Sequence, residues 1–413
     1  MSTTPDQKTG IHRRSLMLGA LGAAASTRAF AQAAAKPIKI GVLTDMSSLY
    51  ADCTGKGSVL ATQMACEDFA KLGKALPFEV IFADHQNKAD IASSVARKWI
   101  DQDGVDVIVD VPNSAVALAV GAIVRDKNKV MLASGPSSSD LTGMACSPNN
   151  IHWTYDTYAL ATGAATAVVQ SGGKSWYNLT ADYAFGHAME QDVRNVVARN
   201  GGTVKGGVRT PLGTQDFSSF LLQAQASGAQ VIGLINAGGD TINSIKQAVE
   251  FGITNGGQRL VATVLYVTDV HSLGLDVAKG LQFTEAFYWD LNEETRAWTK
   301  RFVSRNEQRY PSALHAGAYG SVLHYLKAVA ALGSATDGAA VVAKMKELPT
   351  DDPLFGKGTI RIDGRKIHPM YLFEVKAPAD SKYAWDYYKV VQTIPPDQVW
   401  RPLNEGGCSL VKA

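Results

Sequence analysis

The sequence predicts an α/β fold with two lobes, each a parallel sheet flanked by helices. Short apolar runs alternate with helical patterns from residue 36 to about residue 133, and the same alternation then restarts and continues to about residue 266. Alternation of this kind is typical of parallel sheets with right-handed crossover connections. The length of 413 residues is also sufficient for two domains of ordinary size.

The first series of elements begins with 38–45 (IKIGVLTD), a nearly continuous apolar run that predicts a strand buried on both faces. The run 105–111 predicts another buried strand, and Asn113 or Ser114 directly after it is suited to cap the next helix. The other elements expected in this series are helix 57–71, strand 78–84, helix 89–101, helix 114–127 and strand 130–133.

A second series of similar length makes two Rossmann-like lobes the natural division of the chain. Its expected elements are strand 151–156, helix 158–170, strand 176–180, a helix ending at residue 200, strand 203–210, helix 216–227, strand 231–236, a helix ending at residue 251, and strand 261–266.

Beyond residue 280 the pattern changes. The expected elements there are strand 281–289 and helices 293–310, 314–332 and 341–348. Asp363-Gly364 is a strong turn signal and predicts a hairpin that pairs 359–362 with 370–375. The Pro-rich tail after residue 394 has no assignable pattern.

The composition excludes several classes of protein. Apolar residues make up 46% of the chain and charged residues 19%, as in a soluble globular protein rather than a disordered one. The formal net charge is +2, and lysines and arginines are spread along the chain without a basic stripe. We therefore expect no nucleic-acid partner.

The N-terminal 31 residues are typical of an export signal. Arg13-Arg14 precedes a mildly apolar Ala/Gly-rich stretch, which ends in an A-x-A cleavage site at residues 29–31. Paired arginines in this context favour the twin-arginine route, and an ordinary Sec signal is the alternative. No cysteine follows the site directly, so a lipoprotein anchor is not indicated. We expect a periplasmic protein cleaved near Ala31.

The four cysteines show no metal-binding spacing. Export permits a disulfide. Cys66 lies in a helical pattern and is expected to be buried, whereas Cys146 and Cys408 both lie in coil. If any pair is bridged, the sequence favours Cys146 with Cys408.

Polar residues gather after two neighbouring strands of the first lobe. Asn113 and Ser114 follow strand 105–111, and Ser134, Gly135 and Ser137 follow strand 130–133. Open α/β sheets bind ligands along this carboxyl edge, and a helix N-terminus there favours an anion. No nucleophile–base motif, metal cluster or phosphate loop accompanies these hydroxyls, so we expect a binding protein without a cofactor rather than an enzyme.

An exported hydrolase is the enzymatic alternative. His271 near Asp269 and His187 near Asp182 are the acid–imidazole neighbours that such an enzyme could use. Neither pair is accompanied by a motif that marks a nucleophile.

Five segments in this order carry a resemblance to a known family: IKIGVLTDMSS, VDVIVDVPNSAVALAV, ADYAFGHAM, NAGGDTINSIKQAVEFGI and GLQFTEAFYW. The chain resembles the type I periplasmic binding proteins of ABC uptake systems, in the leucine/isoleucine/valine-binding branch. The resemblance implies two lobes that close on a ligand by hinge bending, joined by three crossovers near Thr154, Trp289 and Ile360. The first lobe would then comprise 36–154 with 289–360, and the second 155–288 with 361–413.

The resemblance also implies ligand contacts. Ser114 corresponds to the first-lobe hydroxyl after the third strand, and Gly135 and Ser137 to the contacts after the fourth. Across the cleft, Phe185 takes an aromatic position and Asn236 follows an inner strand. The full expected set is Tyr50, Asn113, Ser114, Ser134, Gly135, Ser137, Tyr155, Tyr183, Phe185, Asn236, Tyr266 and Asp269.

The expected ligand class follows from a departure from the family pattern. Members that bind amino acids carry a second-lobe acid for the ammonium group, and the matching position here falls near Thr263. Asp269 and Asp182 are possible substitutes. The segment VLYVTDVHSLGL also looks similar to the subgroup associated with aromatic and related organic acids. We therefore predict a monomeric protein that delivers a small organic acid, best an aromatic carboxylate, to an ABC permease with its ATPase; a branched-chain amino acid or amide ligand, or a periplasmic sensor subunit, is the alternative.

Overall fold

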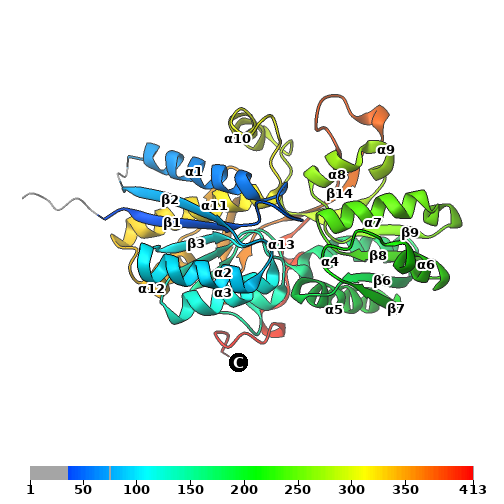
Figure 1. Ribbon diagram of the computed structural model, residues 1–413, viewed down its shortest axis with the longest axis horizontal. Coiled ribbons are helices and arrows are strands. Elements are labelled where there is room, and N and C mark those ends of the chain that lie inside the picture. Colours follow the sequence, from blue (N-terminus) through cyan, green and yellow to red (C-terminus); the bar gives the residue numbers. More distant parts are fainter. Residues whose placement is uncertain (1–35, 74–75, 413) are drawn as a thin grey trace, which may run out of the picture. The chain divides into compact units, whose positions relative to one another are not determined.

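Five parallel strands form the sheet of the first lobe, in the order β2-β1-β3-β4-β5. The computed structural model describes residues 36–73 and 76–412, and the predicted signal peptide lies outside them. The strands are β1 (Ile38–Thr44), β2 (Phe78–Asp84), β3 (Val107–Asp110), β4 (Val130–Ala133) and β5 (Asn150–His152). Helices α1 (Gly55–Lys71), α2 (Ala89–Lys98), α3 (Ser114–Asp126), α11 (Ala313–Leu332) and α12 (Gly338–Glu347) surround this sheet (Figure 1).

Alternate residues of β3 enter two separate apolar cores, as the two-residue period of a strand requires. Val107 and Val109 belong to the large core that includes α1 and α11, whereas Ile108 belongs to a smaller core with α2 and α3. Both faces of the sheet are therefore covered, which explains why the central strands are apolar throughout. In the smaller core Trp99 packs directly on β1, where a Cβ at Gly41 would lie 2.6 Å from its ring.

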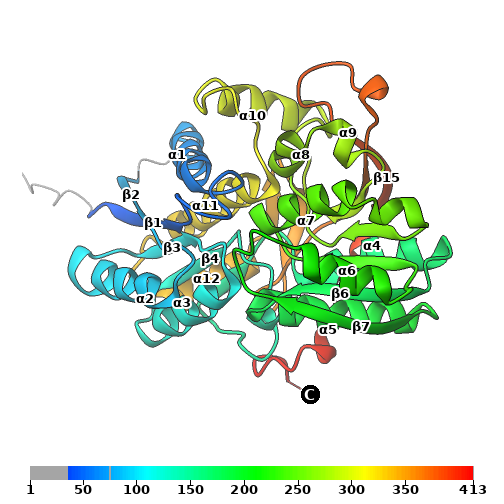
Figure 2. The ribbon, with the colours of Figure 1, turned by 45° about the vertical axis from the view of Figure 1, so that its right-hand side comes forward.

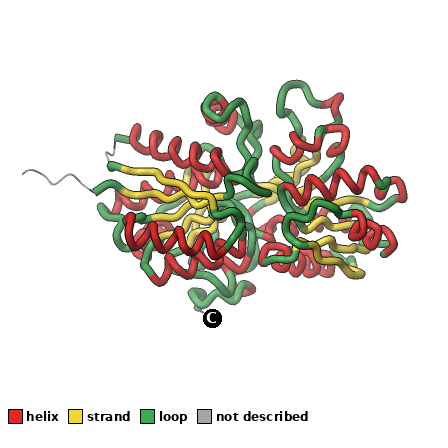
Figure 3. Tube along the Cα trace, in the orientation of Figure 1, coloured by secondary structure: helices red, strands yellow, loops and turns green. Residues whose placement is uncertain are grey.

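The second lobe repeats this architecture around a four-stranded parallel sheet in the order β7-β6-β8-β9. Its strands are β6 (Ser175–Ala181), β7 (Thr203–Thr210), β8 (Val231–Ile235) and β9 (Arg259–Ala262). Its helices are α4 (Thr157–Gln170), α5 (Ala184–Arg199), α6 (Ser218–Ala226), α7 (Gly239–Glu250), α8 (Val267–Leu273) and α9 (Leu275–Ala278). Figure 3 shows the two groups of strands, each between layers of helix, which confirms the predicted fold class.

The last third of the chain adds two small antiparallel sheets. The first, β10-β14-β15, packs on α4 of the second lobe, and the second, β11-β12-β13, packs on α11 and α12 of the first. The strands are β10 (Gln282–Glu285), β11 (Thr350–Asp352), β12 (Gly356–Ile360), β13 (Lys366–Ile367), β14 (Met370–Val375) and β15 (Tyr388–Ile394). The remaining helices are α10 (Glu293–Val303) and α13 (Pro396–Val399).

The predicted hairpin was wrong in its pairing. Asp363-Gly364 does make a turn, but it joins β12 to the two-residue strand β13, while β14 pairs with β10 and β15 in the other lobe. The chain leaves the first lobe at His368-Pro369, and a proline cannot continue a ladder because it lacks an N–H. The third crossover therefore lies between β13 and β14 and not near Ile360.

The expected division at residue 361 also differs from the structure. The turn before β13 stays with the first lobe, since His152 of β5 donates from its N–H to Gly364 O at 3.0 Å. The end of the chain, which was expected in the second lobe, returns to the first through a disulfide between Cys146 and Cys408. This is the pair that the sequence favours, whereas Cys53 and Cys66 are free and buried.

Within residues 36–73 and 76–412, no helix combines the length and the apolar character that crossing a bilayer requires.

Candidate ligand site between the lobes

A small cavity of about 10 Å³, the size of a single water molecule, lies between the two lobes. Most of the residues that line the cavity lie in turns that follow the carboxyl ends of parallel strands, as expected for open α/β sheets. The first lobe supplies Tyr50, Pro112, Ser114, Gly135, Ser137 and Leu314, and the second supplies Tyr183, Phe185, Ala237 and Tyr266. Seven of these ten were predicted. The lobes also meet through a backbone hydrogen bond, in which Gly239 N–H donates to Leu49 O at 3.2 Å.

Ser114 presents a hydrogen-bond donor to the cavity. It is the first residue of α3, and its Oγ accepts from the N–H groups of Ser138 at 3.1 Å and Ser137 at 3.3 Å. Those two bonds occupy the acceptor capacity of the hydroxyl, so its proton is left to donate. Asn113 is not among the lining residues, because its Oδ1 caps α3 by accepting from Ala115 and Val116 N–H.

A buried carboxyl group, that of Asp110, accepts hydrogen bonds that stabilise the turns after β3 and β4. Asp110 accepts hydrogen bonds from Thr44 Oγ1 at 2.7 Å and from Ser134 Oγ at 3.3 Å, and its backbone oxygen accepts from Gly135 N–H at 3.2 Å. Ser134 therefore faces Asp110 and does not line the cavity. Burial raises the pKa of Asp110 to about 6 despite these bonds.

The backbone at this turn is strained. Asp110 and Val111 have φ values of 81° and 54°, a region that bulky side chains rarely adopt. Gly135 is required here, because a Cβ at this position would lie 2.7 Å from Pro112 Cα. This packing fixes the distance between the turns after β3 and β4, which both contribute to the cavity.

Tyrosine hydroxyls pair at the aromatic side of the cavity. Tyr50 of the first lobe and Tyr183 of the second approach to 2.6 Å, as do Tyr155 and Tyr266. Burial raises the pKa of all four phenols, so they remain neutral. Phe185 packs beside Tyr183 with ring centroids 5.7 Å apart. Tyr155 is not among the described residues that line the cavity.

Asn236 and the two candidate acids lie outside the cavity lining. Asn236 organises the start of α7 by accepting from Thr241 Oγ1 at 2.9 Å. Asp269 turns back into α8, where its Oδ2 accepts from Tyr266 N–H at 3.0 Å. Asp182 is exposed and lies 2.7 Å from His187 Nε2. Thr263, at the position expected for an acid, donates to Leu234 O.

Three lining residues were missed by the sequence reasoning. Pro112 and Ala237 lie two residues beyond the ends of strands β3 and β8, so their position after a strand end was a usable signal. Leu314 comes from the first turn of α11, nearly 180 residues beyond Gly135, and no local pattern marks it.

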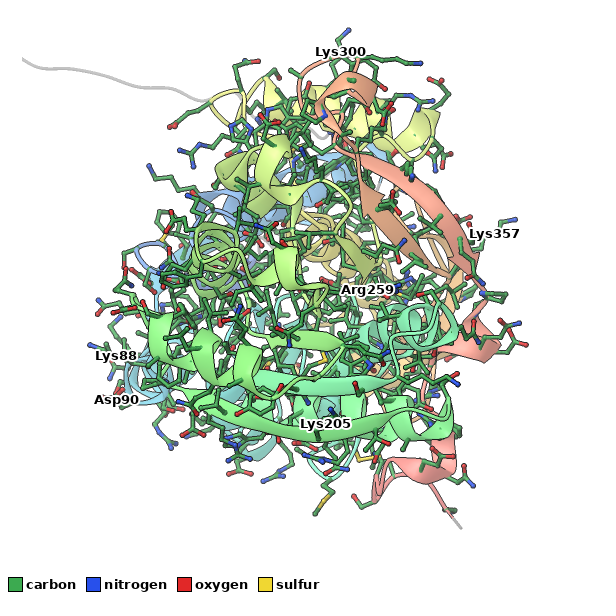
Figure 4. All side chains as sticks on the ribbon, turned by 90° about the vertical axis from the view of Figure 1, so that its right-hand side faces the viewer. Lys88, Asp90, Lys205, Arg259, Lys300 and Lys357 are labelled. Atoms are coloured by element: carbon green, nitrogen blue, oxygen red, sulfur yellow. A yellow bond between two sulfur atoms is a disulfide. The ribbon has the colours of Figure 1, made fainter. Side chains whose placement is uncertain are left out.

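No charged side chain is found among the described residues that line the cavity. The six charged side chains labelled in Figure 4, from Lys88 to Lys357, lie at the outer surface of both lobes instead. His271 stacks on Trp385 with centroids 3.9 Å apart and also lies outside the cavity lining. The site is therefore built from hydroxyls, backbone and aromatic or apolar surface.

Asp269 should make stability depend on pH. Burial raises the pKa of Asp269 to about 7, above the roughly 3.9 of an unfolded chain. Its stabilising contribution is therefore complete below about pH 4 and is lost as the pH rises to about 7. We expect Asp269→Asn, which can still accept from Tyr266 N–H, to raise the Tm at pH 8 by about 2 °C or more and to flatten the profile between pH 4 and 7.

Thermal unfolding followed by circular dichroism across this range checks the prediction. Burial also raises the pKa values of Asp110, Asp192 and Asp240 to about 6, so part of the slope should persist. Asp276→Asn, on the exposed surface of α9, is the matched control and should change nothing. Parallel profiles for the wild type and Asp269→Asn would contradict the prediction.

Comparison with known proteins gives consistent matches. Residues 37–382 match the family described as "Periplasmic binding protein". A curated relative, the Leu/Ile/Val-binding protein homolog 6 of Brucella melitensis biotype 1, is 28% identical over 332 residues, covering 76% of this chain and 81% of the relative. The crystal structure of a periplasmic binding protein from Burkholderia mallei is 50% identical with a TM-score of 0.88, covering 91% of this chain and 99% of the other.

A second solved structure, a branched-chain amino acid ABC transporter periplasmic ligand-binding protein from Burkholderia xenovorans LB400, is 42% identical with a TM-score of 0.80. The match covers 90% of this chain and 99% of the other. Both lobes are thus included in the similarity.

Proposed function

The chain belongs to the type I periplasmic binding proteins, in the leucine/isoleucine/valine-binding branch, and we propose that its ligand is a small aromatic or otherwise apolar monocarboxylate. Members of this family are solute-binding proteins of ABC transporters, not enzymes, and the family implies a periplasmic location. As part of the same proposal, a signal peptide of the twin-arginine type is removed near Ala31, and the monomeric mature protein delivers its ligand to a permease and ATPase.

The single observation that carries the proposal is the cavity-lining hydroxyl of Ser114 at the N-terminus of α3, whose oxygen already accepts from two N–H groups. A carboxylate there would accept a hydrogen bond from Ser114 and would be favoured by the partial positive charge of the helix end. Ser137 adds a second hydroxyl beside it. The opposite side of the cavity, with Tyr183, Phe185 and Tyr266, offers ring surface for an apolar body.

No acidic side chain that could serve as a counter-charge is found among the described residues that line the cavity. Burying an ammonium group without a counter-charge is unfavourable by several kcal/mol, so a zwitterionic amino acid fits this arrangement less well than a monocarboxylate.

A branched-chain amino acid is the second candidate, because the names of the Brucella and Burkholderia xenovorans relatives point to it. In that case an acid near the cavity would have to reach the ammonium group. Asp269 is the best placed, since it lies one helical turn from Tyr266 of the cavity wall.

Isothermal titration calorimetry with benzoate, 4-hydroxybenzoate, leucine and valine distinguishes the two. We expect an aromatic acid to bind at micromolar Kd or tighter, and the amino acids to bind at least about tenfold more weakly, a difference of about 1.4 kcal/mol. Micromolar binding of leucine or valine without binding of the aromatic acids would overturn the monocarboxylate proposal and direct attention to Asp269.

A further inference from the structure

We infer that the C-terminal segment 395–412, which we call the strap, is a fourth connection between the lobes and limits how far they open. The family architecture has three crossovers, and this segment is additional to them. The inference concerns the ligand-free protein and does not depend on which solute the protein carries.

The strap starts in the second lobe. It follows β15, the edge strand of the sheet β10-β14-β15, and its helix α13 packs on α4. Val399 is fully buried and Trp400 is 6% exposed, so this end is firmly packed. Figure 2 shows the red end of the chain running from β15 to the opposite side of the molecule.

The middle of the strap lies over the hinge. Trp400 Nε1–H donates to His368 O at 2.8 Å, and the guanidinium of Arg365 lies 4.6 Å from the centroid of the Trp400 ring. His368 belongs to the third crossover, and Arg365 directly precedes β13 in the first lobe. His368 Nε2 in turn lies 3.0 Å from Thr154 O, a contact between the third crossover and the first. The strap is therefore in contact with the segments that must rotate when the lobes separate.

The end of the strap is bound to the first lobe. Arg401 donates to Ser139 O at 2.9 Å, and its own carbonyl accepts from Arg361 at 2.7 Å. Gly406 packs so closely on the loop after β4 that a Cβ at Gly143 would lie 2.7 Å from Gly406 O. The disulfide from Cys408 to Cys146 makes the attachment covalent.

This arrangement closes a covalent ring across the two lobes. The ring restricts how far the lobes can separate, because its disulfide holds the end of the strap close to Ser139 and Gly143. If opening breaks the strap contacts at these two residues, the contacts re-form readily, since the effective concentration within one molecule is high. Ser139 is two residues from Ser137 of the cavity wall, so the contact acts on the loop that would hold the ligand. The apparent Kd for the ligand falls by the same factor by which the population of the closed, binding-competent conformation rises.

The test measures interlobe distances in the ligand-free protein. Nitroxide labels at Lys88→Cys and Lys205→Cys report on the two lobes, since both positions are exposed and Figure 4 shows them at the surface. The free Cys53 and Cys66 are buried. Distances from pulsed electron paramagnetic resonance are then compared between the protein with the native disulfide and a Cys146→Ser/Cys408→Ser variant. We expect the variant to show a broader distribution with a longer mean distance.

A second variant keeps the test decisive if loss of the disulfide prevents folding. Four Gly/Ser residues inserted after the exposed Glu405 lengthen the strap and leave the disulfide intact, and should shift the distances in the same direction. Cys66→Ala, which removes a thiol without cutting the strap, is the control and should match the wild type. If the folded disulfide variant and the insertion variant both keep the wild-type distribution, the strap does not limit opening.

Discussion

Replacing Ser114 by alanine should weaken ligand binding by about 1–3 kcal/mol, the usual cost of losing one hydrogen-bond partner of a charged group. This corresponds to a loss of about 5- to 150-fold in Kd. The reason is that the Ser114 hydroxyl lines the cavity and its oxygen already accepts from two N–H groups of the 137–138 loop, which leaves its proton to donate to a ligand. Alanine removes both the donor and the support of that loop.

Calorimetry with the tightest-binding solute of the panel above measures the effect. Ser114→Thr keeps the hydroxyl and should recover part of the affinity. Ser218→Ala is the matched control, because Ser218 is likewise the first residue of a helix, α6, but lies outside the cavity lining. An unchanged Kd for Ser114→Ala would exclude the proposed carboxylate contact.

Arg365→Met should lower the free energy of unfolding by about 3–5 kcal/mol, the range for removing one partner of a buried ion pair. Arg365 is completely buried, donates to Tyr155 O at 2.6 Å and lies 3.9 Å from Asp156. Burial lowers the pKa of Arg365 to about 10, so the guanidinium is still charged at neutral pH. Methionine would leave the Tyr155 carbonyl and the Asp156 carboxylate buried without their cation.

Urea unfolding at pH 7 followed by circular dichroism checks this prediction. The control is Arg209→Met, whose guanidinium pairs with Asp182 and Glu190 on the exposed surface and should cost at most about 1 kcal/mol. Arg365→Lys retains a charge but not the forked geometry, and should be intermediate. Equal midpoints for Arg365→Met and Arg209→Met would show that the hinge does not depend on this cation.

The sequence predicted the parallel sheets because each central strand is a short apolar run, and the structure explains that pattern by the two cores on either side of β3. It also placed most of the cavity wall, since Ser114, Gly135 and Ser137 follow strands that had been located correctly. Long-range pairing was harder to predict. The turn at Asp363-Gly364 was visible, but a turn does not specify which sheet the next strand joins.

The sequence alone could not distinguish the roles of neighbouring polar residues at the site. Asn113 and Ser114 are both polar residues at a helix start, and only the capping bonds of Asn113 show which side chain remains for the cavity. For Asp269 only a partial signal was present: its spacing from Tyr266 is that of a capping box, which directs the carboxylate to the backbone, but the residue types are not the usual Ser or Thr with Glu or Gln. Leu314 had no such signal.

The described residues that line the cavity all lie in turns or in the first turn of a helix, and none of them lies in the interior of a strand. The residues that would select a solute are thus almost entirely different from those that hold the sheets together. Over evolutionary time, such a chain can exchange Ala237 or Leu314 and acquire a new solute while its strands keep their register. Divergence of ligand within a conserved architecture is therefore an expected outcome of this fold.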